Sequence, residues 1–235
     1  MIAFLTLTND GYIDYTLNCY ESLNNIDTEL NLKSYCIGSY SFDTLCKYNY
    51  TCELLNDNIN TNFQTFRTGN WSNITLKKFD IIYDNLRTYD YVLFTDGDIV
   101  YENNKFIHYL LEHIKDYDIL IQNDTLDDFC TEILCTGFMF IRSNEKTLKL
   151  FHPNNTKQYE NFVGFDDQVY VNAIKDYLNF KLLPLNLFPN GQYYYNNYQT
   201  MNPYIIHFNW VVGHHKKDKM ILHKKCKTQF RTNRF

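Results

Sequence analysis

Two aspartates, Asp96 and Asp98, stand one glycine apart directly after an apolar run, YVLFT, at residues 91–95. The run is short and rich in aromatic and branched residues, which predicts a buried strand that presents both carboxylates at its C-terminal end. Open α/β sheets bind ligands at that end of their strands. Two hard oxygen donors there suit Mn²⁺ or Mg²⁺ bridging a diphosphate, and Gly97 would let the backbone approach a bulky ligand.

A second D-x-D triplet, formed by Asp116 and Asp118 in KDYDILIQ, serves as an internal control. A chain of this aspartate content contains about one such triplet by chance, so the pattern alone is weak evidence. Asp116 and Asp118 precede their strand and would lie at its N-terminal end, away from the ligand crevice. Position therefore favours Asp96 and Asp98 as the metal site, with a capped strand-to-helix turn as the alternative.

The segment IIHFNWVVGHHKKDKM, residues 205–220, combines a histidine, a glycine and several lysines. His207 ends a strand and can coordinate a metal, although a lone histidine on an apolar strand is more often a core residue. Gly213 offers backbone close to an anion, and a following lysine can neutralise a phosphate. The candidate lysines are Lys216, Lys217 and Lys219. The Asp-Gly-Asp motif and this basic end together favour the ligand role.

Polar residues also occur at the expected ends of other elements. Asp166, Asp167 and Gln168 begin a helix in GFDDQVYVNA, where Asp166 can simply cap the free N–H groups. Gln168 beside Asp167 is suited to gripping hydroxyl groups. Asn123 and Asp124 end the strand DILIQ, and Thr136-Gly137 opens CTGFMFIRS, where a tight backbone could face a sugar ring.

The elements that must position these residues alternate between strand-like and helical patterns. IAFLTLT, LKSYCIG, YVLFT and DILIQ are strand-like, and YIDYTLNCYESL, FDTLCKYN and NKFIHYLLEHIK are helical. This alternation predicts βα units and a single α/β domain with a mainly parallel central sheet flanked by helices. Residues 72–87 predict an amphipathic helix capped by Ser72.

After residue 125 the order of elements becomes less regular. CTGFMFIRS predicts a strand, whereas NEKTLKLF and DDQVYVNAIKDYL predict helices. The Tyr/Asn-rich stretch NGQYYYNNYQTMNP predicts an irregular loop.

Composition indicates a globular protein with a sizeable core, because 45% of its 235 residues are hydrophobic. No run of about 18 apolar residues predicts a membrane span, and the N-terminus lacks the features of a signal peptide, so we expect a cytoplasmic protein. The seven cysteines are odd in number and contain no C-x-x-C pair, which argues against a disulfide framework or a zinc knuckle.

Charge is unevenly distributed along the chain. The net charge is −5, yet from residue 214 onward eight Lys and Arg side chains accompany a single aspartate. The remainder is strongly acidic, which argues against a nucleic-acid surface. The basic end fits a solvated tail, an anion site or a weak contact with a membrane surface.

Five sequence blocks resemble the nucleotide-diphospho-sugar transferase family of GT-A-fold glycosyltransferases. They follow the family's order over almost the whole chain, and the H-x-N-W-x-x-G-x-x-x-K block is more diagnostic than the Asp-Gly-Asp block. The blocks are KKFDII (77–82), VLFTDGDIVY (92–101), TGFMFIR (136–142), DQVYVN (167–172) and HFNWVVGHHKK (207–217).

The resemblance implies a GT-A-like nucleotide-sandwich fold and transfer of a sugar from a nucleotide-diphosphate sugar, expected to be a UDP-sugar, with retention of configuration. The acceptor would be a glycan, a protein or a lipid. Mn²⁺ is the expected ion, with Mg²⁺ as the second choice. In the single domain over residues 1–235, residues 1–101 would bind the nucleotide and residues 102–235 the donor sugar and acceptor.

The resemblance also assigns individual residues. Asp98 and His207 would be the principal metal ligands, with Asp96 touching both metal and ribose. The family spacing selects Lys217 over Lys216 to hold the diphosphate together with Gly213. The remaining assignments are Lys78 beside the phosphates, Thr8 and Asn9 beside base and ribose, and Asp124, Gly137, Asp167 and Gln168 around the donor sugar.

The expected chemistry is front-face substitution, because the sequence offers no strong carboxylate nucleophile and Gln168 is a poor one. Asp167 and Gln168 are the candidate catalytic residues beside the donor sugar. Two rival readings remain. VLFTDGDIV also resembles the first motif of haloacid-dehalogenase-type phosphatases, with Asp166 and Asp167 as their acidic metal motif. The chain could also be a non-catalytic module that binds sugar nucleotides or glycans.

Overall fold

A seven-stranded sheet forms the centre of the computed structural model, which describes residues 1–26, 29–55, 59, 61–127, 132–160 and 162–228. The strand order is β3-β2-β1-β4-β7-β6-β8, and β7 alone runs antiparallel to its neighbours. The predicted α/β class with a mainly parallel sheet is therefore confirmed. The strands are β1 (Ile2–Asn9), β2 (Leu32–Ile37), β3 (Cys52–Leu55), β4 (Tyr91–Thr95), β6 (Ile119–Asn123), β7 (Leu134–Arg142) and β8 (Phe180–Leu183).

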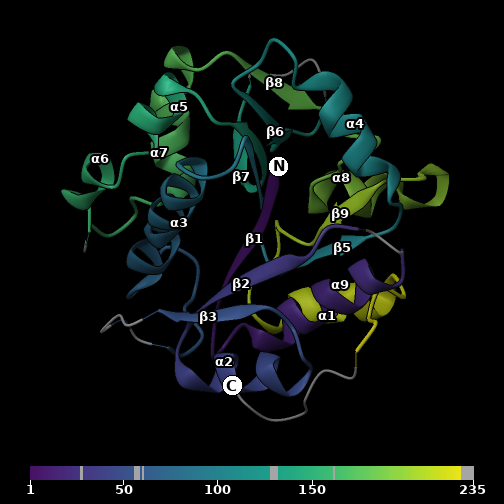
Figure 1. Cartoon of the computed structure of the whole chain (residues 1–235). Coiled ribbons are helices and arrows are strands. Elements are labelled where there is room, and N and C mark those ends of the chain that lie inside the picture. Colours follow the sequence, from purple (N-terminus) through teal and green to yellow (C-terminus); the bar gives the residue numbers. More distant parts are fainter. Residues whose placement is uncertain (27–28, 56–58, 60, 128–131, 161, 229–235) are drawn as a thin grey trace.

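Helices cover both faces of this sheet (Figure 1). Successive strand residues point to opposite faces, so in β1 Phe4 packs into one core and Ala3 and Leu5 into the other. The first core is closed by α1 (Ile13–Asn24), α2 (Ser39–Lys47) and α4 (Lys105–His113). The second is closed by α3 (Trp71–Leu86), α5 (Glu145–Leu150) and α7 (Asp167–Ile174).

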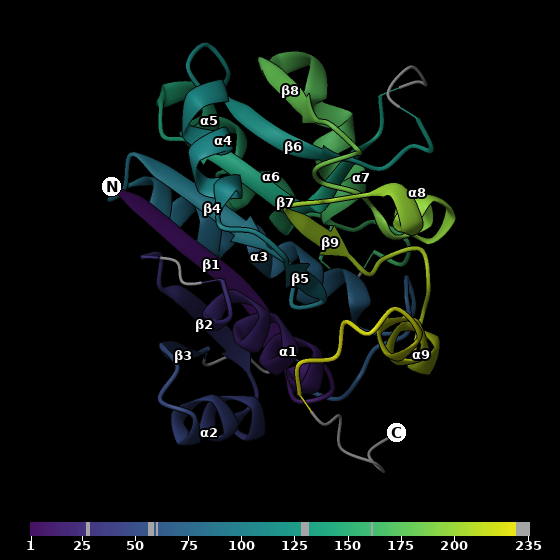
Figure 2. The same ribbon diagram turned by 90° about the vertical axis from the view of Figure 1, so that its right-hand side faces the viewer.

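A second, two-stranded sheet lies against the first face beside α1 (Figure 2). It pairs β5 (Ile99–Tyr101) with β9 (Ile205–His207) in antiparallel register. Its buried side chains pack with Tyr15 of α1 and with Met220 of α9 (His214–Leu222). This small sheet joins the chain just after the Asp-Gly-Asp motif to the region after residue 204.

Two local predictions are wrong. Helix α3 has Asn70, not Ser72, at its N-cap position, and the buried Ser72 hydroxyl instead donates to the Phe162 carbonyl at 3.0 Å. The stretch expected to be an irregular loop forms α8 (Gly191–Asn197) and a 3-10 turn, Tyr198–Thr200. The Asn190 side chain caps α8 by accepting from the Tyr193 amide at 2.9 Å.

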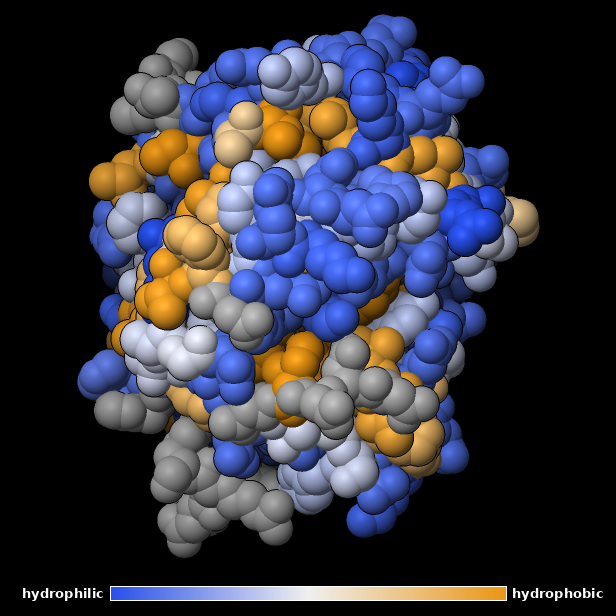
Figure 3. Space-filling model, turned by 90° about the vertical axis from the view of Figure 1, so that its left-hand side faces the viewer, coloured by the Kyte–Doolittle hydropathy of each residue, from blue (hydrophilic) through white to orange (hydrophobic). Residues whose placement is uncertain are grey.

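The hydropathy of the outer surface is that expected where helices shield the apolar faces of a sheet from solvent. On the face over α3 and the short helix α6 (Asn154–Lys157), hydrophilic residues cover most of the middle and hydrophobic residues form separate patches (Figure 3). Among the described residues, no helix combines the length and the apolar character that a membrane span needs. The six cysteines within the described ranges are free thiols.

Candidate functional site

One edge of the main sheet collects the predicted site residues. Strands β1, β4 and β6 end at this edge, and the antiparallel β7 begins there. A cleft of about 540 Å³ lies at this edge. Of the residues predicted for the site, those that line it are Thr8, Asn9, Lys78, Asp96, Asp98, Asp124, Gly137, Asp167, Gln168, His207 and Gly213. Lys217 is not among the described residues that line the cleft.

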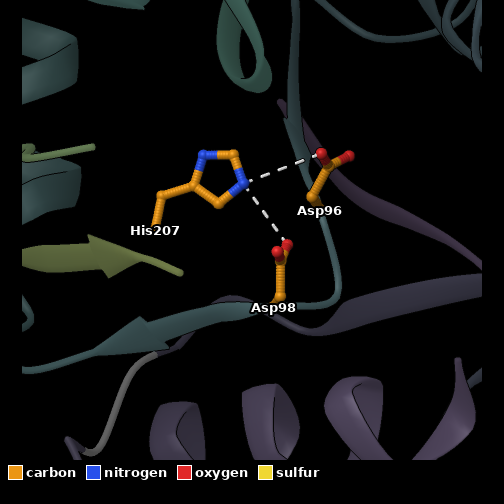
Figure 4. Close-up of side chains that lie close together, drawn as sticks. All are labelled: Asp96, Asp98 and His207. Carbon is orange, nitrogen blue, oxygen red and sulfur yellow. Dashed lines mark ion pairs between the residues drawn. The ribbon is translucent and has the colours of Figure 1, made fainter. Parts of the chain in front are cut away.

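Asp96, Asp98 and His207 form a compact three-residue cluster in the cleft (Figure 4). One ligand atom from each lies within 4.8 Å of the others. His207 Nε2 is 3.3 Å from Asp98 Oδ1 and 3.9 Å from Asp96 Oδ2. The β5–β9 pairing creates this contact, because Ile99, next to Asp98, lies opposite His207. Two carboxylates and an imidazole are a donor set that suits Mn²⁺.

The imidazole of His207 is oriented by Gln122 at the end of β6. Both amide hydrogens of Gln122 are directed at the Phe188 and Pro189 carbonyls, at 3.2 and 2.9 Å. Its oxygen, 2.7 Å from His207 Nδ1, therefore accepts a hydrogen bond from that nitrogen. The lone pair of the neutral ring is then on Nε2, which faces the two carboxylates. A metal-binding histidine commonly has such a hydrogen-bonded partner on its other nitrogen.

Gly137 leaves the space that this cluster occupies. A Cβ atom at this position would lie 2.2 Å from His207 Cε1 and 2.9 Å from Asp96 Oδ2. Any larger residue would push the imidazole away from the carboxylates. Gly97, in contrast, allows close packing against α1, because a Cβ there would lie 2.5 Å from Thr16 Oγ1.

Lys78 of α3 joins two of the carboxylates in the cleft floor. Its ammonium group lies 3.0 Å from Asp96 Oδ1 and 2.5 Å from Asp167 Oδ2, and it donates to the Thr136 carbonyl at 3.2 Å. Burial alone lowers the pKa of Lys78, but Asp167 and Asp96 outweigh this effect and raise it above its ordinary value. Lys78 is therefore a permanent, buried positive charge.

Lys216 contacts the Asp96–Asp98–His207 cluster, whereas Lys217, expected to hold the diphosphate, is not among the described residues that line the cleft. Its ammonium group contacts Asp98 Oδ2 and donates to the Tyr12 hydroxyl at 2.6 Å. Helix α9 begins at His214, so Lys216 lies one turn before the buried Met220 and on the same side, whereas Lys217 is rotated by about 100°. Burial would raise the pKa of Asp98, but Lys216 and His207 outweigh it and hold that pKa well below its ordinary value.

Gly213 lines the cleft immediately before α9. Its backbone φ of 56° lies in the left-handed region that favours glycine, and its carbonyl accepts from the Tyr15 hydroxyl at 3.2 Å. Gly213 thereby sets the direction in which α9 leaves the cleft.

Asp124, which also lines the cleft, accepts hydrogen bonds from three side chains. Its Oδ2 accepts from Gln168 at 2.9 Å, and its Oδ1 accepts from Asn209 at 3.1 Å and from the Trp210 indole at 2.9 Å. Gln168, predicted to contact the donor sugar, is thus held by another predicted residue. Trp210 is half-exposed at the cleft and has a φ of 62°, a conformation that is strained for a bulky residue.

Asp166 is a helix cap, the alternative considered for it from sequence. Its Oδ1 accepts from the Val169 amide at 2.9 Å, and its Oδ2 pairs with Arg67 at 2.8 Å. Arg67 also lines the cleft. Arg67 could not be identified from the sequence, because it lies in a polar segment without periodicity. Tyr12 and Gln122 also carried no signal in the sequence.

The second triplet lies at the opposite end of its strand, as expected from its position. Asp116 is exposed and precedes β6. Asp118 is buried and accepts from Asn144, Lys146 and the Asn179 amide, at 2.9, 2.7 and 2.8 Å. This carboxylate therefore ties together the loops at the far edge of the sheet.

The chain is similar in sequence and in fold to known glycosyltransferases. A UDP-galactose:fucoside alpha-3-galactosyltransferase of Dictyostelium discoideum is 28% identical over 92% of this chain, which spans 41% of that relative. The fold resembles the galactosyltransferase LgtC (TM-score 0.65, 13% identity, 97% of each chain covered). It also resembles the glycosyltransferase GlyE of Streptococcus pneumoniae (TM-score 0.60, 15% identity, 94% of this chain and 59% of that one). A profile of the nucleotide-diphospho-sugar transferases matches residues 42–221, and the chain belongs to that family.

Proposed function

We propose that this chain is a metal-dependent glycosyltransferase that moves a sugar from a UDP-sugar to a glycan, protein or lipid acceptor. The observation that carries this proposal is the cluster of Asp96, Asp98 and His207 inside a cleft that also contains two lysines. Such a site is suited to a nucleoside diphosphate bound together with a divalent cation. The family match and the activity of the Dictyostelium relative support it.

We assign separate roles in donor binding to the proposed metal ligands, to Lys216 and Gly213, and to Lys78. Asp96, Asp98 and His207 would hold Mn²⁺, which supplies Lewis-acid stabilisation of the departing diphosphate when bound. Lys216 lines the cleft and Lys217 is not among its described lining residues, so we assign the charge contact to Lys216. The backbone at Gly213 would face the same phosphates. Lys78 would hold the side chains of Asp96 and Asp167 in place through its two ion pairs.

Asn9, which the family resemblance places beside the base, supports uracil as the base of the donor. The Asn9 side-chain nitrogen donates to the Asn62 carbonyl at 3.1 Å, while its Oδ1 is buried and has no hydrogen-bond partner among the described residues. An acceptor of this kind matches the N3–H donor of uracil and would face a lone pair in cytosine. Thr8, whose hydroxyl accepts from Thr16 at 2.9 Å, supports the same turn.

Retention of configuration by front-face substitution is part of the proposal. Asp167 is 5% exposed, and its Oδ2 is held by Lys78 and by the Thr136 hydroxyl at 2.6 Å. These contacts reduce its freedom to attack the sugar. Gln168 donates to Asp124 and would position the donor sugar rather than react with it. A covalent glycosyl-enzyme trapped at Asp167 would contradict front-face substitution.

A thermal-shift screen of nucleotide sugars with Mn²⁺ tests the proposed function. A ligand present at a hundred times its dissociation constant stabilises the folded state by about 2.7 kcal/mol. We expect UDP-sugars to raise the melting temperature and the corresponding CDP compounds to raise it less. If no nucleoside diphosphate shifts the melting temperature, the transferase proposal is wrong.

The two rival functions make different predictions. In the phosphatase reading the motif ends the first strand, whereas here it follows β4, and the family match points elsewhere. A non-catalytic module would bind donors without slow hydrolysis of the sugar–phosphate bond, so release of UDP from the bound donor separates it from an enzyme. A cytoplasmic location and a weak membrane contact of the basic end remain predictions from sequence, and part of that end, residues 229–235, lies outside the described residues.

A further inference from the structure

Two lysines compensate most of the carboxylate charge around the Asp96–Asp98–His207 cluster. Three carboxylates, Asp96, Asp98 and Asp167, stand against two ammonium groups, Lys78 and Lys216. Counting these carboxylates and ammonium groups alone, the fixed charge around the cluster is therefore about −1 rather than −3. A divalent ion alone is attracted less strongly to such a site than to three uncompensated carboxylates.

The two lysines differ in how firmly they are held. Lys78 is 3% exposed and has three oxygen partners, from Asp96, Asp167 and the Thr136 carbonyl. Lys216 is less buried and contacts one carboxylate, that of Asp98, together with the Tyr12 hydroxyl. Lys78 is thus fixed by the fold, whereas the Lys216 ammonium group has two oxygen partners among the described residues and is less buried.

The surroundings of Lys216 allow its side chain to move while the helix stays in place. Its ammonium group lies over the rings of Tyr12 and Tyr15, 5.2 and 5.9 Å from their centroids. Such cation–π contacts do not require one exact position of the ammonium group. The far end of α9 is anchored, because Met220 is buried and Asn18 donates to the Lys225 carbonyl at 3.1 Å. Lys216 also lines the cleft, so a change of its rotamer is the movement that would take its ammonium group from Asp98 to a ligand there.

We propose that Lys216 is an exchangeable cation that couples metal binding to nucleotide binding. In the nucleotide-free protein it neutralises Asp98 and weakens the binding of a divalent ion. When a nucleoside diphosphate enters, Lys216 moves to its phosphate oxygens and releases Asp98 to the ion. The inference rests on the proposed function in one respect, which is that a nucleoside diphosphate occupies this cleft.

This exchange has a thermodynamic consequence that can be measured. If the nucleotide removes Lys216 from Asp98, UDP must increase the affinity for Mn²⁺, and Mn²⁺ must increase the affinity for UDP by the same factor. Direct bridging of the ion by the diphosphate also contributes to this coupling. The part due to Lys216 is the part that disappears when its charge is removed.

The test compares Mn²⁺ affinity, measured by electron paramagnetic resonance of the free ion, in the wild type and in Lys216→Met, each with and without UDP. Without UDP, Lys216→Met should bind Mn²⁺ roughly tenfold more tightly, because a positive charge beside Asp98 is lost. With UDP, the variant should lose most of that advantage and bind UDP more weakly. Lys219→Met, one turn further along α9, removes the same charge away from the cleft and should match the wild type.

Two results would overturn the exchange. In one, Lys216→Met binds Mn²⁺ without UDP no better than the wild type, which would mean that Lys216 does not compete for Asp98. In the other, Lys219→Met shows the same gain as Lys216→Met, which would indicate a general charge effect. Either result leaves the transferase proposal intact provided that UDP still strengthens Mn²⁺ binding. Lys216→Arg, which keeps the charge, should retain the wild-type affinity without UDP. If Lys216→Met fails to fold, Lys216→Gln, which also removes the charge but keeps a polar side chain, should show the same gain in Mn²⁺ affinity, and no gain would overturn the exchange.

Discussion

The two carboxylate oxygens of Asp98 face different partners. Oδ1 lies 3.3 Å from His207 Nε2, and Oδ2 contacts the ammonium group of Lys216. Asparagine would place an amide NH₂ against one of these nitrogens and would remove the negative charge that a cation needs. Because Asp98 is 2% exposed, water cannot readily take over either contact.

Asp98→Asn and His207→Ala should each reduce Mn²⁺-dependent sugar transfer or donor hydrolysis by roughly a hundredfold or more, because each removes a proposed metal ligand. Turnover measured across an Mn²⁺ titration checks this, with circular dichroism to confirm that the fold is retained. Asp116→Asn, in the exposed second triplet, is the matched control and should have nearly wild-type turnover. An Asp116 variant as damaged as the Asp98 variant would show that the metal has been assigned to the wrong triplet.

The positions of some site residues in the fold could be predicted from the sequence, and those of others could not. Asp96 and Asp98 were predictable because the strand before them is apolar and their position at its end is a local property. The choice between Lys216 and Lys217 was not, because it depends on where α9 begins and on which side packs through Met220. A shift of one residue rotates a helical side chain by about 100°, and the sequence pattern did not define that rotation.

Among the elements, the small β5–β9 sheet could not be predicted, yet its pairing brings His207 next to Asp96 and Asp98. Each strand has three residues, and the two are separated by about a hundred residues in the chain. The sequence indicated that His207 ends a strand but contained no information on its partner. Helix α8 was missed for another reason, since its tyrosines and asparagines have low helix propensity and its formation depends on the Asn190 cap and on packing of the buried Tyr194.

His223, at the C-terminal end of α9, should make that element sensitive to acid. Both ring nitrogens are buried without a hydrogen-bond partner among the described residues, and the ring lies beside Tyr194, Tyr195 and Tyr198. Burial, with Lys219 and Lys225, lowers the pKa of His223 below its usual value of 6.5. The folded state therefore binds a proton less readily than the unfolded state, so stability is full above about pH 6.5 and falls as the pH decreases below it.

The corresponding measurement is the melting temperature at pH 7.5 and at pH 5.5. The wild type should lose more stability between these values than His223→Gln, which cannot titrate in this range. His108, which is exposed on α4, provides the control, because His108→Gln should follow the wild type. Equal losses in the wild type and in His223→Gln would show that other groups govern the acid sensitivity.

At the scale of the whole molecule, the alternation of strands and helices predicted the fold class, but the direction of β7 was not predicted. Its residues are buried on both faces, so CTGFMFIRS is apolar almost throughout and fits a parallel or an antiparallel strand equally well. The reversal places its first residues, including Gly137, at the same edge as the ends of β4 and β6. The cleft therefore depends on a feature of the sheet that no local pattern specifies.

Because Lys78 and Lys216 compensate the carboxylates, the ion should be required for activity but not for folding. EDTA should abolish transfer, and added Mn²⁺ should restore it within the mixing time. Far-UV circular dichroism should not change on chelation, and without nucleotide the melting temperature should decrease by no more than about 2 °C. Transfer that persists in EDTA would contradict the metal assignment, and unfolding by EDTA would show that the ion is structural.

The β5–β9 pairing also constrains when the site can form during synthesis. A growing chain presents Asp96 and Asp98 to the solvent about a hundred residues before His207 and Lys216 are made. At bacterial or eukaryotic elongation rates, this interval is on the order of ten seconds. During that time Lys78 is the only one of the two compensating lysines that has been synthesised. The cleft is therefore one of the last parts of the described structure to be completed, and a ribosome-bound chain that ends before β9 lacks His207, one of the three proposed metal ligands.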